Sequence, residues 1–116
     1  MGLVVSAVLF TLAAIGGLTM AYIFFKKKRS PPFPLVLGHG AVALTAVVTL
    51  LWAVMRSDRG GPAAWALGFF FVAAFVGFFL FSYHIRDKYP PSPVIAIHAT
   101  LAIMALVLLL GGIIAG

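Results

Sequence analysis

Apolar residues along the 116-residue chain fall into four long runs, and short polar segments separate them. Each run is close to the roughly 20 residues that a helix needs to cross about 30 Å of hydrocarbon. The pattern therefore predicts an all-α integral membrane protein, an up-down bundle of four helices in a single transmembrane domain over residues 1–116. The predicted spans are residues 2–25, 35–55, 62–83 and 94–115.

The composition supports a membrane protein over a soluble one. Hydrophobic residues make up 64% of the chain and charged residues only 9%, whereas soluble globular proteins carry about 25% charged residues. The first run has no basic leader and its lysines follow it, so we expect it to be retained and not cleaved as a signal peptide. The chain has no cysteine, which excludes a disulfide or a thiolate ligand.

The positions of the basic residues explain the formal net charge of +6 without a nucleic-acid partner. Residues 26–29 are all basic and lie in the first connection, Arg86 and Lys88 lie in the third, and the second holds Arg56 and Arg59. Cytoplasmic loops of membrane proteins are enriched in Lys and Arg. We therefore expect the first and third connections in the cytoplasm and both termini outside it, in a bacterial cytoplasmic membrane.

The second half of the chain repeats the first. The segments SPPFPLVLGHGAVALTAVVTLL and YPPSPVIAIHATLAIMALVLLL align without a gap at a spacing of 59 residues, which places His39 on His98. Such self-similarity predicts a tandem duplication of a two-helix hairpin, with repeat one at 1–57 and repeat two at 60–116. At the same spacing the first and third runs share three weaker matches: Ala7 with Ala66, Phe10 with Phe69, and Ala14 with Ala73.

His39 and His98 are predicted to face each other inside the bundle. Each lies five residues after the last proline of its cluster, so the two are at the same depth. Small residues share the helix face of each histidine, among them Ala43 and Ala102, and small residues mark helix-facing surfaces in membrane bundles. The second and fourth helices of an up-down bundle are expected to be diagonal neighbours.

Two opposed neutral imidazoles, with no acid or thiol in any span, suit the two axial positions of a haem iron. Gly38 and Gly40 flank His39, and Gly77 lies at a similar level on the third run, which leaves room for a flat ring. Basic side chains at the same membrane surface are candidates to bind haem propionates. The predicted cofactor-binding residues are His39, His98, Gly38, Gly40, Ala43, Ala102, Gly77, Arg29 and Arg86, with the two histidines as metal ligands.

This arrangement resembles membrane-bound b-type cytochromes, where diagonal helices of a four-helix bundle supply paired histidines. The resemblance rests on His39, His98, the glycines and the topology, and on no extended motif. It implies a membrane electron-transfer protein, a non-catalytic carrier or a subunit of an oxidoreductase complex, whose partner is a quinone or a redox protein. Those families often carry two histidines on each ligand helix, so one per helix here implies a single haem b.

Other functions remain open from the sequence. A cofactor-free structural or assembly subunit of a larger membrane complex would use the histidines only for helix pairing. A pigment-binding subunit would hold the magnesium of one chlorophyll-type pigment on each histidine. A proton-coupled transporter is disfavoured because no acidic residue lies within a span. His84, at the end of the third run, is either an interfacial residue or a group that contacts a propionate or carries protons.

Overall fold

The computed structural model describes residues 2–57 and 61–115, which form four α-helices. Each helix is long and apolar enough to cross a membrane, so the four predicted helices are confirmed, with ends within two residues of those expected. Arg59, expected in the second connection, lies outside the described residues. The helices are α1 (Gly2–Lys26), α2 (Phe33–Ser57), α3 (Pro62–Ile85) and α4 (Ser92–Ala115).

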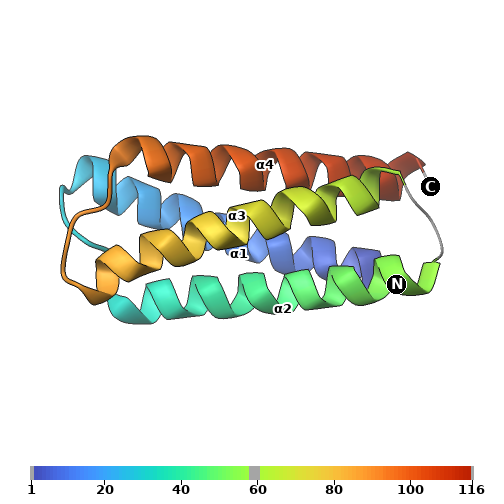
Figure 1. Ribbon diagram of the computed structural model, residues 1–116, viewed down its shortest axis with the longest axis horizontal. Helices are drawn as coiled ribbons and strands as arrows, with labels where there is room; N and C mark the ends of the chain where they lie inside the picture. The colour runs from blue at the N-terminus through green and yellow to red at the C-terminus, as the bar shows by residue number, and fades with distance from the viewer. Residues whose placement is uncertain (1, 58–60, 116) are drawn as a thin grey trace.

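The helices form two antiparallel hairpins that pack into one bundle. Helix α1 packs on α2 and α3 packs on α4, while α1–α4 and α2–α3 contacts join the hairpins. Helices α2 and α4 therefore occupy one diagonal of the bundle, and α1 and α3 occupy the other. Residues 27–32 and 86–91 connect the helices at one end, and the chain termini lie at the opposite end (Figure 1). We call these the loop end and the terminal end.

Proline and left-handed residues set the turns at the loop end. The backbone N–H of Val36 bonds to Pro32 O at 3.2 Å, which closes the first turn of α2, and Ile95 repeats this with Pro91 in α4 at 3.3 Å. A proline in or just before the first turn costs little, because its missing N–H has no helical partner there. Asp87, with φ of 54°, reverses the chain after α3.

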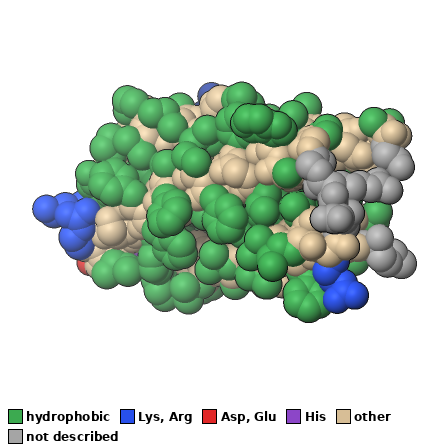
Figure 2. Space-filling model, turned by 45° about the vertical axis from the view of Figure 1, so that its right-hand side comes forward, with side chains coloured by type: hydrophobic (Ala, Val, Ile, Leu, Met, Phe, Trp, Pro, Cys, Tyr) green, Lys and Arg blue, Asp and Glu red, His purple; other side chains and the backbone are tan. Residues whose placement is uncertain are grey.

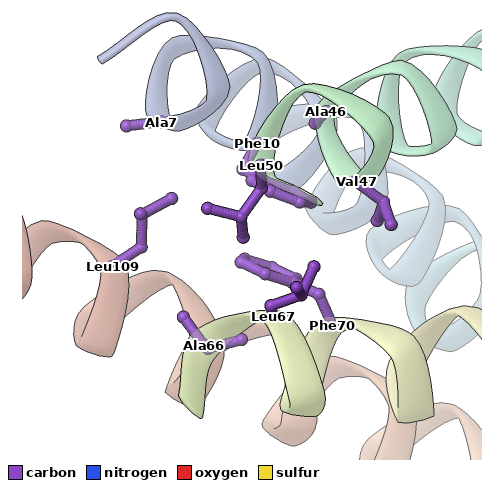
Figure 3. Close-up of a cluster of buried hydrophobic side chains, with 10 residues drawn as sticks. Ala7, Phe10, Ala46, Val47, Leu50, Ala66, Leu67, Phe70 and Leu109 are labelled. Carbon is purple, nitrogen blue, oxygen red and sulfur yellow. The ribbon is translucent and has the colours of Figure 1, made fainter. Parts of the chain in front are cut away.

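The terminal half of the bundle holds a tightly packed apolar core. Leu50 of α2 and Leu109 of α4 are completely buried, and the rings of Phe10 and Phe70 stack with their centroids 3.5 Å apart. Figure 3 shows these side chains converging from all four helices. We call this the packed half; it comprises helix residues 2–12, 44–57, 62–72 and 103–115.

The two hairpins are related by an approximate twofold axis, but their helices follow different spacings. Burial along α2 recurs in α4 after 59 residues, as predicted, so His39 is equivalent to His98. Burial along α1 recurs in α3 after 60 residues, which makes Phe10 equivalent to Phe70. The equivalence of Phe10 with Phe69 that the ungapped alignment suggested is therefore off by one residue.

The two spacings differ by one residue because α3 is one residue shorter than α1 at the end of the helix. The residues that reverse the chain after α1 and α3, Lys28 and Asp87, both have φ of 54° and are again 59 positions apart. The change from a spacing of 60 to one of 59 must therefore fall between the middle of the helix and this turn. Helix α3 therefore ends one residue earlier than α1 at the loop end. The turns that follow the two helices each contain a left-handed residue, Lys28 in one and Asp87 in the other.

Charge and hydrophobicity are segregated along the length of the bundle. Apolar side chains cover the middle of the face seen in Figure 2, and Lys and Arg side chains stand out towards its ends. Large apolar residues such as Val48, Trp65 and Val107 are more than half exposed. A surface of this kind is compatible with an integral membrane protein.

Candidate cofactor site

His39 and His98 are each fixed by a hydrogen bond within their own hairpin. Nδ1 of His39 on α2 lies 2.8 Å from the carbonyl oxygen of Ala13 on α1, and Nδ1 of His98 on α4 lies 2.8 Å from that of Ala73 on α3. A carbonyl oxygen can only accept, so Nδ1 must carry the proton and donate. Nε2 of each ring is then left with a lone pair, and it has no hydrogen-bond partner among the described residues.

A glycine on the facing helix allows each imidazole to lie close to the backbone. A Cβ on Gly17 would lie 3.1 Å from Cε1 of His39, and a Cβ on Gly77 would lie 3.1 Å from Cε1 of His98. Any larger residue at either position would press on the ring. The two glycines therefore determine where the imidazoles lie, together with the carbonyls one turn earlier on the same helices.

The two imidazoles approach each other across the centre of the bundle. Their ring centroids are 6.3 Å apart and their planes are inclined by 81°. The rings come from the diagonal helices α2 and α4, so each reaches inward from an opposite side. His39 and His98, 59 residues apart in the sequence, are thus brought to one level in the middle of the molecule.

A cavity of about 470 Å³ surrounds the histidine pair. Its walls come from all four helices and are almost wholly apolar, and the stacked rings of Phe10 and Phe70 line it at the end next to the packed half. Alanine and glycine supply much of the wall near the histidines: Ala14, Gly17, Gly40, Ala43, Ala74, Gly77 and Ala102. We call this part of the bundle the hollow half; it comprises helix residues 13–26, 33–43, 73–85 and 92–102.

Several of the predicted site residues lie around this cavity and others do not. His39, His98, Gly40, Ala43, Gly77 and Ala102 all line it. Gly38 is exposed on α2, and Arg29 is exposed in the connection after α1. Arg86 is also outside the lining; its Nε donates to the carbonyl of Ser82 at 3.1 Å, and its guanidinium lies over the ring of Tyr83.

Some features of the site carry no simple signal in the sequence. The carbonyl groups of Ala13 and Ala73 are backbone acceptors that any residue could supply. Phe10 and Phe70, which line the cavity, could have been paired by aligning the first and third runs at a spacing of 60. At that spacing Gly17 also falls on Gly77.

The donor set at the site is limited to the two imidazoles. Within residues 2–57 and 61–115, no group of three or more His, Cys, Asp or Glu side chains could hold a metal ion. A bare metal ion would need more than two protein ligands. A metal in a macrocycle, which supplies the other ligands itself, needs only two nitrogens from the protein and fits this donor set better. Comparisons of the chain with protein-family models, with curated protein sequences and with solved structures found no match.

Proposed function

We propose that the protein is a membrane electron-transfer protein that holds one b-type haem between His39 and His98. The observation that carries the proposal is the pair of diagonal imidazoles in an apolar cavity, each with Nδ1 bonded to a carbonyl. When bound, the haem supplies a one-electron couple that the protein side chains lack. The protein binds and orients the macrocycle and keeps water away from it.

The separation of the two rings suits two axial ligands of one metal. A metal–imidazole bond is about 2.0 Å long, and a ring nitrogen lies roughly 1.1 Å from the centre of its ring. Two imidazoles on opposite sides of one iron should thus have centroids roughly 6 Å apart. The observed separation of 6.3 Å agrees with this expectation.

The hydrogen bonds leave each imidazole in the tautomer that ligation requires. Histidines that bind metals usually donate the other ring N–H to a carbonyl or carboxylate, which holds the ring in position. Ala13 and Ala73 play this role for His39 and His98. The same hydrogen bonds would also serve a purely structural pairing of helices within each hairpin, and the use of Nε2 distinguishes the two roles.

The size of the cavity also favours a bound group. Ligand sites in proteins typically measure about 300–1,000 Å³ and are mostly apolar. The space of about 470 Å³ beside the histidines is of this size and character. Lipid chains could fill the volume, but they offer nothing to the two ring nitrogens.

The surroundings of the cavity suit a lipid bilayer with the haem near one surface. The cavity lies in the half of the bundle next to the basic connections, and haem carboxylates would be directed towards that polar end. By the excess of Lys and Arg, that end faces the cytoplasm and both termini lie outside, as in a bacterial cytoplasmic membrane. A quinone or a redox protein would then exchange electrons with the haem, and the chain could act alone or as a subunit of an oxidoreductase complex.

The approximate twofold axis supports the proposal that the chain arose by duplication of a hairpin. Each hairpin contributes one histidine, one carbonyl and one glycine to the site in the same arrangement. A hairpin with one histidine offers one axial ligand, and two hairpins complete a pair. Duplication would join both ligands in one chain.

The absorption spectrum of the purified protein tests the proposal. Protein produced with an ample supply of haem should show sharp reduced-minus-oxidised bands of a six-coordinate haem. His39→Ala and His98→Ala should each lose these bands. His39→Gly should regain them when imidazole is added, because free imidazole can occupy the vacated position.

Matched controls come from the lipid-facing side of the same helices. Val48 and Val107 lie on α2 and α4 at the same 59-residue spacing and are 65% and 64% exposed. Val48→Ala and Val107→Ala should keep the wild-type spectrum. A well-folded colourless protein would refute the proposal and favour a structural subunit, whereas red-shifted pigment bands would favour a chlorophyll-type ligand.

A further inference from the structure

The rim of the cavity at the loop end holds one polar side chain that the proposed function does not use. Of the described residues that line the cavity, the titratable ones are His39, His98 and His84. His84 lies in the last turn of α3, and its ring stacks on that of Phe33 with centroids 5.5 Å apart and planes inclined by 15°. This contact fixes the plane of the imidazole, yet neither ring nitrogen has a hydrogen-bond partner within residues 2–57 and 61–115.

Neighbouring polar groups at the same rim are already engaged. The hydroxyl of Tyr89 donates to the carbonyl oxygen of Phe24. The guanidinium of Arg86 donates to the carbonyl and to the hydroxyl of Ser82, at 3.1 and 3.2 Å. His84 is therefore the group at this rim that both borders the cavity and keeps its donor available.

His84 also breaks the approximate twofold symmetry of the site. At the 60-residue spacing of α1 and α3, the position equivalent to His84 is Phe24, and both side chains line the cavity. One side of the rim thus offers an N–H donor, and the other side offers only an apolar ring. The ligand pair below this rim is nearly symmetric, with equal hydrogen bonds and equal glycine contacts on both sides.

Haem b carries its two carboxylates at one edge of the ring. Turning the ring over exchanges its faces between His39 and His98 and exchanges the two carboxylates, so a carboxylate lies on each side of the polar end in either orientation. A single donor on one side of the rim can therefore reach a carboxylate whichever way the ring is inserted.

We propose that His84 donates a hydrogen bond to a carboxylate of the bound tetrapyrrole and thereby anchors it at the loop end of the cavity. This inference rests on the proposed function. A neutral imidazole always keeps one N–H, and a hydrogen bond to an ionised carboxylate is among the stronger ones that proteins make. The sequence suggests Arg29, Arg86 and His84 as groups that contact a carboxylate, and of these three His84 lines the cavity.

A double-mutant cycle between the protein and its ligand tests the contact. The apoproteins of the wild type and of His84→Phe are titrated with haem and with haem dimethyl ester. In His84→Phe, phenylalanine stands on both sides of the rim, at positions 24 and 84. We expect His84→Phe to weaken the binding of haem about tenfold, as is usual for a lost hydrogen bond to a charged group. The same variant should bind the ester as tightly as the wild type does, because the ester has no carboxylate.

The exchanged variant, Phe24→His with His84→Phe, moves the N–H donor to the other side of the rim. A carboxylate of haem lies on that side too, so this variant should bind haem more tightly than His84→Phe does and should bind the ester equally well. This third variant separates a directed contact from a loss of stability.

The outcomes distinguish this inference from the proposed function. If wild type takes up no haem with two axial histidines, both proposals fail. If the six-coordinate spectrum is intact in every variant but His84→Phe weakens haem and ester equally, or neither, the His84 contact alone is refuted. An exchanged variant that bound haem no better than His84→Phe would likewise overturn the contact.

Discussion

The packed half and the hollow half of this bundle are built from the same four helices but from different side chains. Leu50, Leu109 and the stacked Phe10–Phe70 pair fill the space between the helices in the packed half. In the hollow half, alanine and glycine line much of the space beside the histidines, around a cavity of about 470 Å³.

This contrast shows how one fold can separate stability from binding. Small residues in a membrane bundle usually allow helices to approach closely. Here Gly17 and Gly77 bring an imidazole, and not another helix, against the backbone. We infer that the packed half holds the bundle together and that the hollow half is shaped for a ligand.

The largest difference between the two halves is expected in the stability that is lost when a leucine is truncated. Leu50→Ala should lower the free energy of unfolding of the haem-free protein by about 2–4 kcal/mol, because it opens a cavity in a close-packed region. Leu37→Ala in the hollow half is the matched control: this side chain borders the existing cavity and is 48% exposed, so its loss should cost under about 1 kcal/mol. The free energy of unfolding of both variants is measured in detergent from the loss of the helical circular dichroism signal with increasing denaturant. Equal losses of stability in the two variants would argue against two distinct halves.

A smaller effect is expected from adding a methyl group beside a histidine in the hollow half. Gly17→Ala or Gly77→Ala places a Cβ 3.1 Å from a ring carbon, and the strain should weaken haem binding about tenfold, within the range of overpacking costs. Gly16→Ala, whose Cβ would be 3.8 Å from the nearest atoms of His39, should leave the affinity unchanged. Haem titration of the apoproteins measures all three, and an equal loss in Gly16→Ala would show that the contact with the ring is not what matters.

The sequence predicts the fold well because hydrophobic run length constrains helices strongly. The four spans and the diagonal placement of α2 and α4 follow from run lengths and from short connections. The register of α1 against α3 was harder, because the spacing of 59 residues that fits α2 and α4 also gives chance matches such as Ala7 with Ala66, whereas α1 and α3 follow a spacing of 60. Low-complexity apolar segments supply many such matches.

The site was only partly predictable, for reasons that differ between residues. The proline clusters and the repeat place His39 and His98 at one level, and the structure brings their rings together. The carbonyls of Ala13 and Ala73 are invisible in a sequence, since every residue has one. Arg29 and Arg86 were chosen for charge alone, and side-chain direction places them outside the cavity lining.

Low-temperature electron paramagnetic resonance of the ferric protein tests the central claim most directly, because it reports both axial ligands and the angle between their planes. Two imidazoles with planes inclined by 81° should give a single low-spin ferric signal with the large g anisotropy typical of near-perpendicular ligand planes. His39→Ala and His98→Ala should convert it to a high-spin signal. A wild-type protein, produced with ample haem, that gave only a high-spin signal or none would contradict axial ligation by this pair.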